Sequence, residues 1–246
     1  MQESPTMGND LLPADFSIVD QPQAINDLAW QVAQRVFRVD TTKPGFALVD
    51  FGSAGEPRTY RRLLVEMGLG LRRAYAQQYS GRLGFIWVGR FDQQTTTRPH
   101  RDGAPAGSVL MLGYEPSAVP AQLALVDYAR LAGERGITPS EWLERYNPMY
   151  HPAIVPELTP YTTPVAGFDH RRYQLLVINN GTASLDDRSS GMIGLLHQAT
   201  VPTPDLSQTR HVNSLMLARL GHDETAGLLS EQLQRYIEQA MAASSC

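Results

Sequence analysis

The spacing of apolar residues changes at Gly81, and this change limits the folds open to the chain. Between residues 57 and 80, four large side chains recur at helical spacing: Leu64, Met67, Leu71 and Tyr75. This pattern predicts one long amphipathic helix. The next segment, RLGFIWVGRFD at 82–92, is rich in aromatic and β-branched residues, which predicts a strand. One face of that strand is expected to carry Phe85, Trp87, Gly89 and Phe91. Helices therefore come first, and strands begin after Gly81.

Two shorter elements are predicted before the long helix. Apolar residues at helical spacing in QPQAINDLAWQVAQRVF predict a helix over 21–37. The segment KPGFALVDFGS, residues 43–53, alternates its side chains between two glycines and predicts a strand. Residues 1–14 combine Pro, Gly, Asn and acidic residues, so we expect a loose tail there.

Four further segments have the composition of strands: 108–114, 172–179, 191–201 and 210–217. The chain between the first two of these is different. Its residues predict a helix in AQLALVDYARLAGERG (121–136), a short helix in PSEWLERY (139–146) and a proline-rich loop over 147–166. We therefore expect residues 115–170 to form an insertion carried on a β core.

A helix from Asp223 is expected to close the chain. Its apolar face would carry Leu229, Leu233, Ile237, Ala240 and Met241. No internal repeat or linker divides the 246 residues, which predicts a single domain over 1–246. Helices that frame a set of short strands predict a mainly β, α+β fold with a closed or nearly closed β core.

Composition excludes several classes of function. The net charge of −4 gives no reason to expect a nucleic-acid or membrane-surface partner. No stretch approaches the roughly 18 consecutive apolar residues of a membrane span. Because Cys246 is the single cysteine, an intramolecular disulfide is impossible, and we expect a reducing, cytoplasmic location. The chain also lacks a G-x-S-x-G elbow and a phosphate-binding glycine loop in strand–helix context.

Three residues have the pattern of a metal site. His100 and Asp102 lie two apart in TTTRPHRDGAP, so on extended chain their side chains point the same way. His197 shares an otherwise apolar strand face in IGLLHQATVP, where a buried imidazole needs a partner. Two histidines and one carboxylate form the facial triad of non-heme iron sites. The alternatives are a turn stabilised by Asp102 and a buried His197 bonded to a backbone carbonyl.

Two arginines are candidate anion ligands. Arg210 opens the strand RHVNSLML, where its guanidinium would suit a carboxylate, although a surface ion pair with Asp205 is the alternative. Arg90, in FIWVGRFD, lies close in sequence to the candidate metal site and could contact an anionic substrate or cofactor. An ion pair with Asp92 or another acid is the competing interpretation. His211 is expected to face away from Arg210 on an extended strand.

The segments PHRD and LLHQATVPTPDLSQTRHVNSLML resemble the His-x-Asp…His…Arg motif of iron(II)- and 2-oxoglutarate-dependent dioxygenases, with a prolyl-hydroxylase-like arrangement. The resemblance covers residues 45–217 in outline and implies a double-stranded β-helix, a jelly-roll or cupin-like core. It implies that His100, Asp102 and His197 bind Fe(II) and that Arg210 pairs with the distal carboxylate of 2-oxoglutarate. A small molecule or peptide would be hydroxylated with O2, releasing succinate and CO2.

One residue departs from the family pattern. Many members place Ser or Thr two residues after the arginine to help hold the carboxylate, but here that position is Val212. The nearest hydroxyl on the same face is that of Ser214, which we take as a candidate cosubstrate ligand. Two other functions stay open: a cupin-like metal or small-molecule binding domain without redox activity, and a metal-dependent hydrolase or isomerase. The sequence does not identify the substrate.

Overall fold

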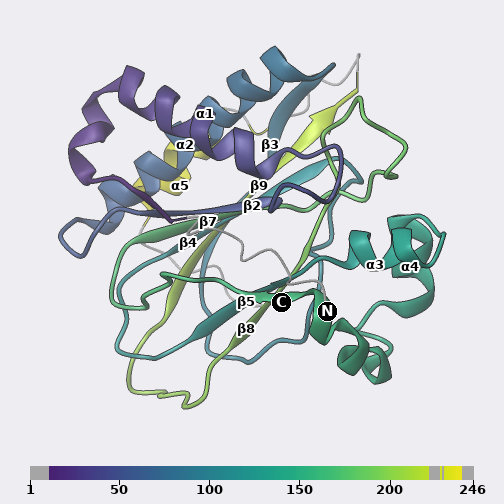
Figure 1. Ribbon diagram of the computed structural model, residues 1–246. Helices are drawn as coiled ribbons and strands as arrows, with labels where there is room; N and C mark the ends of the chain where they lie inside the picture. The colour runs from purple at the N-terminus through teal and green to yellow at the C-terminus, as the bar shows by residue number, and fades with distance from the viewer. Residues whose placement is uncertain (1–10, 222–227, 229, 240–246) are drawn as a thin grey trace.

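The computed structural model describes residues 11–221, 228 and 230–239, which are arranged in three layers (Figure 1). Helices α1 (Pro22–Val36), α2 (Pro57–Gln78) and α5 (Ser230–Glu238) cover one face of a six-stranded sheet. A three-stranded sheet lies on the other side, and α3 (Tyr128–Glu134) and α4 (Pro139–Tyr146) lie at its flank. The fold is therefore α+β, as predicted.

The two long helices form where the sequence predicts them. Each begins with proline in its first turn, where the missing N–H group would have no helical acceptor anyway. They pack closely at Gly70, because a Cβ atom there would come within 2.5 Å of the Cβ of Ala29. Before α1, the short 3₁₀ helix η1 (Phe16–Asp20) is capped by the side chain of Asp15.

The large sheet has the strand order β1-β2-β7-β4-β9-β3. Its strands are β1 (Leu11–Pro13), β2 (Phe46–Asp50), β7 (Gln174–Asn179), β4 (Ser108–Tyr114), β9 (His211–Leu220) and β3 (Arg82–Asp92). Only the β1–β2 pair is parallel among these neighbours. Part of the predicted tail is thus an edge strand, and residues 1–10 lie outside the described residues.

The small sheet has the order β6-β5-β8 and is antiparallel. Its strands are β5 (Gln122–Val126), β6 (Thr162–Pro164) and β8 (Leu196–Thr200). Apolar side chains from both sheets meet between them, among them Leu48, Leu112, Leu125, Ile178, Leu195 and Met216. A second, larger core fills the space between the large sheet and helices α1 and α2. The large sheet is therefore buried on both faces, which explains its nearly continuous apolar strands.

The structure corrects the prediction for residues 121–136. The first part is strand β5, because Leu123 and Leu125 alternate into the core between the sheets, and α3 begins only at Tyr128. The proline-rich stretch contains the 3₁₀ helix η2 (Pro152–Tyr161) and then β6. Residues 115–170 are therefore not only a helical insertion, since they supply two strands of the small sheet.

The predicted face of β3 is also wrong. The pairing with β9 shifts register between Phe85 and Trp87, which is a β-bulge. As a result, Phe85 packs in the core under the helices, whereas Phe91 packs in the core between the sheets. The extra residue reverses the alternation, so Arg90 lies on the opposite face of the sheet from Phe91.

Two more predictions are narrowed. The strand expected over 191–201 is shorter, since β8 begins at Leu196. The closing helix is described only from Ser230 to Glu238. The other residues predicted for it lie outside the described ranges, which exclude 222–227, 229 and 240–246. The sequence predicts a closed or nearly closed β core, but within the described ranges neither sheet closes on itself.

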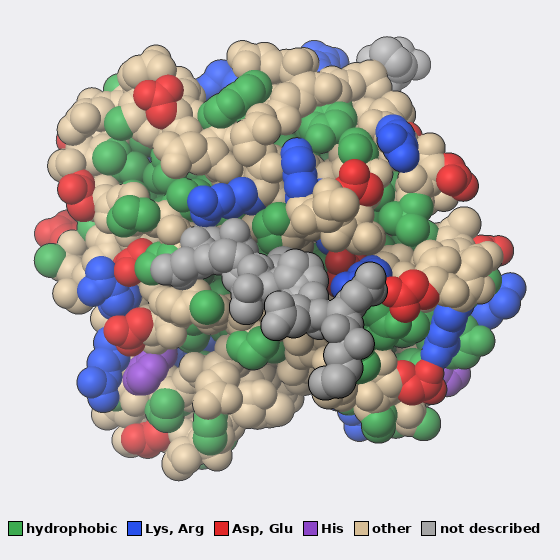
Figure 2. Space-filling view, in the orientation of Figure 1, with side chains coloured by type: hydrophobic (Ala, Val, Ile, Leu, Met, Phe, Trp, Pro, Cys, Tyr) green, Lys and Arg blue, Asp and Glu red, His purple; other side chains and the backbone are tan. Residues whose placement is uncertain are grey.

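The surface and the helices agree with the composition. On the face drawn in Figure 2, basic and acidic side chains are interspersed over the residues that are coloured, and neither sign forms one large patch. None of the helices in the described part of the chain has the length and apolar content needed to span a bilayer.

Candidate metal centre

His100 and His197 are brought together by backbone pairing between distant segments. Their backbones exchange two hydrogen bonds, from His100 N to His197 O at 2.9 Å and from His197 N to His100 O at 2.8 Å. Residues directly opposite each other in an antiparallel pair point to the same side, so the imidazoles lie side by side, with ring centroids 4.2 Å apart and planes tilted by 46°. The small sheet thus extends beyond β8 to the segment that carries the His-x-Asp motif.

Asp102 completes a cluster of three ligand atoms. Its Oδ1 lies 3.4 Å from His100 Nε2 and 3.7 Å from His197 Nε2. The candidate ligand atoms of the three residues all lie within 4.8 Å of one another, close enough to hold one metal ion. The structure therefore brings together the three side chains that the sequence analysis selected.

Hydrogen bonding orients one of the two imidazoles. The Nδ1 atom of His100 lies 2.8 Å from the Arg98 carbonyl oxygen, which can only accept, so Nδ1 carries the proton. In the neutral form of the ring, the lone pair is then on Nε2, which lies on the side of Asp102 and His197, as in many metal sites. The buried Nδ1 of His197, by contrast, has no hydrogen-bond partner among the described residues.

The electrostatics of His197 and Asp102 favour the protonation states of metal ligands. Burial, reinforced by the charge of His100 and opposed by Asp102, lowers the pKa of His197 to about 4. Burial acts to raise the pKa of Asp102, but its hydrogen bond to His100 and the nearby positive charges lower that pKa overall. Burial also acts to lower the pKa of His100, yet its hydrogen bonds to Asp102 and Arg98 raise the net pKa. At neutral pH, His197 is therefore a neutral donor and Asp102 an anion.

Arg210 is a buried cation without an acidic partner in the described structure. It is only 2% exposed, and burial lowers the pKa of its guanidinium. Its Nη1 donates to the Gln93 carbonyl at 2.6 Å, and its guanidinium carbon lies 5.3 Å from the centre of the Tyr114 ring. Its Nη2 has no hydrogen-bond partner among the described residues. The alternative of a surface ion pair with Asp205 is therefore wrong.

One cavity joins Arg210 to the metal cluster. This inner cavity has a volume of about 240 Å³ and lies between the two sheets. Its polar lining includes His100, Asp102, His197, Arg210, Gln93 and Tyr114. Apolar side chains of β3, β4 and β9 complete the walls, namely Phe91, Leu112 and Val212. The same cavity is therefore lined both by a donor cluster for a metal and by a buried guanidinium.

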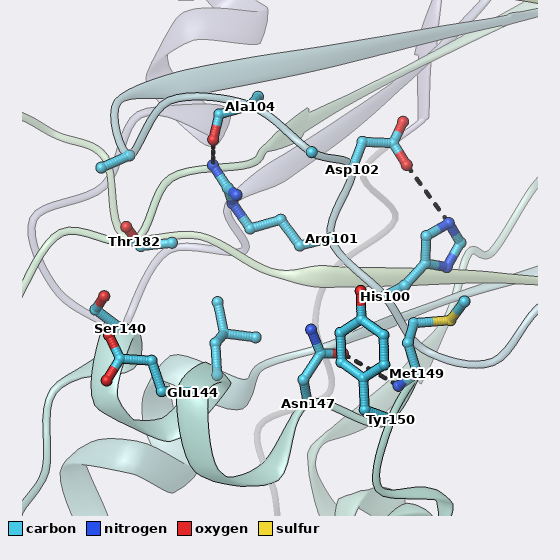
Figure 3. A pocket seen from close by; sticks show the side chains of 13 residues that line it. His100, Arg101, Asp102, Ala104, Ser140, Glu144, Asn147, Met149, Tyr150 and Thr182 are labelled. Carbon is cyan, nitrogen blue, oxygen red and sulfur yellow. Dashed lines mark hydrogen bonds and ion pairs between the residues drawn. The ribbon is translucent and has the colours of Figure 1, made fainter.

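A second, more open cleft reaches the cluster from outside. The outer cleft has a volume of about 590 Å³ and shares His100 and Asp102 with the inner cavity (Figure 3). Its opposite wall comes from α4 and the following turn, with Ser140, Glu144 and Tyr150 among its residues. Two of the three candidate ligands therefore lie where an inner and an outer compartment meet, and His197 lines the inner one.

Arg90 and Ser214 do not line the inner cavity. The Arg90 guanidinium forms two 2.8 Å hydrogen bonds with the buried carboxylate of Glu115 and lies 2.8 Å from His211 Nδ1, on the helix side of the sheet. This position gives no support to the prediction that Arg90 contacts a cofactor, because the side chain lies on the other side of the sheet from the inner cavity. The alternative of an ion pair holds, with Glu115 in place of Asp92. Ser214 shares the inner face of β9 with Val212 but lies outside the cavity lining, so its position gives no support to a cosubstrate contact.

Sequence reasoning missed several residues of the site. Tyr114 faces the inner cavity because it pairs with Val212 across β4 and β9, a register that no local pattern predicts. Thr97 also lines the cavity, and its hydroxyl accepts a hydrogen bond from Ala199 N at 3.0 Å. Glu144 could have been found only as a polar residue on the exposed side of the helix predicted at 139–146.

Comparison with known proteins adds no relative: no family model and no curated protein matches this sequence.

Proposed function

We propose that this protein is a non-heme Fe(II)- and 2-oxoglutarate-dependent oxygenase that hydroxylates a small-molecule or peptide substrate. The observation that carries the proposal is the inner cavity, in which a His-Asp-His cluster and a buried guanidinium without an acidic partner among the described residues face one space of about 240 Å³. Two histidine side chains and one carboxylate match the donor set that Fe(II) takes in such oxygenases.

The winding of the chain supports the double-stranded β-helix that the resemblance implies. From β3 onwards the chain crosses repeatedly between the sheets, and only β5 and β6 follow each other within one of them. β3, β4, β7 and β9 belong to the large sheet, and the 97–100 segment, β5, β6 and β8 belong to the small one. Two facing antiparallel sheets with chain crossing between them are the arrangement of a jelly roll. The metal cluster lies on the small sheet, and Arg210 lies directly before β9 of the large one.

The inner cavity suits a small dianion. Drug-sized ligands occupy pockets of roughly 300–1,000 Å³, so a space of 240 Å³ is suited to something smaller. Arg210 would donate to one carboxylate through its Nη2, and the apolar walls would contact the carbon chain. 2-Oxoglutarate places a second carboxylate and a keto oxygen at its other end, where they can reach the metal.

Each residue has a definite task in this proposal. Fe(II) and 2-oxoglutarate, when bound, supply the oxidation: O2 converts 2-oxoglutarate to succinate and CO2 and inserts one oxygen atom into a substrate C–H bond. His100 is held in the ligating tautomer by the Arg98 carbonyl. Arg210 positions the cosubstrate, and Phe91, Leu112 and Val212 exclude water from the inner cavity.

The test is to load the purified protein with Fe(II) and 2-oxoglutarate without oxygen and to record the visible charge-transfer band. Oxygen is then admitted and succinate is measured. We expect a band and succinate release for the parent, and loss of both in His197→Ala. The matched control is His151→Ala, because His151 is exposed and does not line either compartment.

The alternatives give different results in the same experiment. Metal binding without a 2-oxoglutarate-dependent band or succinate would contradict the oxygenase and leave a cupin-like binding domain. Metal-dependent hydrolysis or isomerisation in the absence of oxygen would indicate the third class of function.

A further inference from the structure

The outer cleft contains a carboxylate that the proposed oxygenase chemistry does not use. Glu144 lies on α4 and lines the cleft across from Arg101 and Asp102 (Figure 3). Its side chain makes no hydrogen bond or ion pair with any residue that the structure describes. A charged group that faces a cleft and lacks a protein partner is available to a ligand.

The orientation of α4 fixes Glu144 toward the cleft. Trp142 is fully buried against Tyr128 and the surrounding apolar residues. Two residues further along a helix is a rotation of about 200°, so Glu144 points away from that core. A capping box between Thr138 and Glu141 holds the first turn of α4 in place. Ser140 lies one turn before Glu144 and lines the same cleft.

The other charged groups in the cleft are already engaged. Arg101 donates to the carbonyl oxygens of Asn180, Ala104 and Pro105 at 2.6 to 2.7 Å. Asp102 belongs to the candidate metal cluster. Among the described residues that line the cleft, Glu144 is therefore the charged side chain that remains available to bind a ligand.

The lip of the cleft is apolar and held in position. Tyr150 is 79% exposed and Met149 is 45% exposed, although both are large hydrophobic residues. The turn that carries them is closed by a 3.0 Å hydrogen bond from Tyr150 N to the Asn147 carbonyl. A ligand in the cleft would bury part of both side chains, and a tyrosine ring also attracts cations.

We propose that the substrate is a protonated amine on an apolar body, which Glu144 binds through its ammonium group while Tyr150 and Met149 cover the carbon skeleton. This inference rests on the proposed function, since it assigns the outer cleft to the substrate. It makes Glu144 a specificity-determining residue and places the ammonium on the α4 wall of the cleft. The rest of the skeleton then extends toward His100 and Asp102.

The test measures binding without turnover. Protein loaded with Mn(II) and 2-oxoglutarate is titrated, without oxygen, with matched sets of a primary amine, an alcohol and a carboxylic acid on butyl, phenethyl and indolylethyl bodies. We expect at least one amine to bind about fivefold more tightly than its alcohol, a preference that weakens with salt because the cleft is open. Glu144→Gln should remove the preference, and Glu144→Lys should shift it toward the acid. Glu231→Gln, at an exposed position on α5, is the control and should keep it.

Two outcomes would overturn the inference: no amine that binds more tightly than its alcohol, or an amine preference that survives in Glu144→Gln. Failure of the proposed function is a separate result. It is seen as an absence of succinate release by the parent with Fe(II) and oxygen, and it leaves the amine preference measurable on the Mn(II)-loaded protein.

Discussion

Replacing Arg210 with methionine should affect stability and cosubstrate binding very differently. In the ligand-free protein the guanidinium is buried, has no acidic partner in the described structure and has one nitrogen without a hydrogen bond. With 2-oxoglutarate bound, the same nitrogen would face a carboxylate. Arg210→Met keeps the volume and removes the charge, so it separates the two states.

The expected change in stability is small because gains and losses offset each other. The variant loses one hydrogen bond to the Gln93 carbonyl, worth about 1 kcal/mol, and a contact with the Tyr114 ring worth about 1 kcal/mol. It also removes a buried unsatisfied N–H group, which costs about 1–3 kcal/mol in the parent. The ligand-free variant should therefore unfold within about 1 kcal/mol of the parent, or roughly 2–4 °C for a chain of this size.

The expected change in binding is large. Removal of one partner of a buried charged hydrogen bond costs about 2–5 kcal/mol, which corresponds to a loss of roughly 30-fold to a few thousand-fold in 2-oxoglutarate affinity. The assay is calorimetric titration of the Mn(II)-loaded protein without oxygen, with thermal unfolding of the ligand-free protein alongside. 2-Oxopentanoate is the matched ligand, because it keeps the keto acid and the carbon chain but lacks the distal carboxylate. Its affinity should change little between parent and variant.

Two results would refute this reasoning. If Arg210→Met binds 2-oxoglutarate within threefold of the parent, Arg210 does not hold the distal carboxylate. If the ligand-free variant loses more than about 2 kcal/mol of stability, Arg210 is a structural residue and its lack of a partner has been misinterpreted. The exposed Arg171→Met is the control and should change neither quantity.

Three further predictions concern the scaffold. Glu115→Gln should cost about 3–5 kcal/mol in urea unfolding because it leaves the buried Arg90 without its carboxylate. Burial acts to raise the pKa of Glu115, but its hydrogen bonds to Arg90 and Asn213 lower that pKa overall. The ionised carboxylate therefore contributes stability above the usual glutamate pKa near 4.5, and this stability is lost as the pH falls through the folded-state pKa. Below pH 4.5 the variant should lose less stability than the parent. Trp142→Ala should cost about 3–5 kcal/mol and loosen α4, as measured by unfolding and by faster amide exchange in α4. Gly181→Ala should destabilise the protein by more than about 2 kcal/mol in thermal unfolding, since the new Cβ would lie 2.0 Å from the Met192 carbonyl oxygen. Gly136→Ala is the control, because open space surrounds its Cβ and only the backbone φ of +66° opposes the substitution.

The candidate metal cluster was predictable because its pattern is local at both ends. His100 and Asp102 need only an extended segment to point the same way, and His197 needed only to stand out on an apolar strand. The sequence could not show that two backbone hydrogen bonds between His100 and His197 would bring the halves together. That contact is a property of the sheet register, which depends on the whole core.

The errors have physical causes that local patterns do not contain. The composition of residues 122–126 is compatible with a helix as well as with a strand. They form strand β5 because they pair with β8 in the folded protein. The bulge in β3 inserts one residue and reverses every face prediction after it, and the alternation of residues 82–92 does not show where such a bulge falls. Glu144 could not be selected from the sequence for another reason. Exposed acidic residues are common on helices, and only the fold shows that this helix forms one wall of a cleft.

The arrangement of the two compartments suggests how chemistry and specificity are divided in this protein. The inner cavity is built from strands of both sheets, where burial and backbone pairing hold each side chain tightly. The far wall of the outer cleft comes from α4 and the turn after it, which join β5 to β6 and contribute no strand to either sheet. Substitutions in that segment can therefore alter the cleft without disturbing the ligand cluster or Arg210. If the proposal for Glu144 is correct, exchanging residues on the cleft face of α4 should change which substrates bind while the affinity for 2-oxoglutarate stays the same.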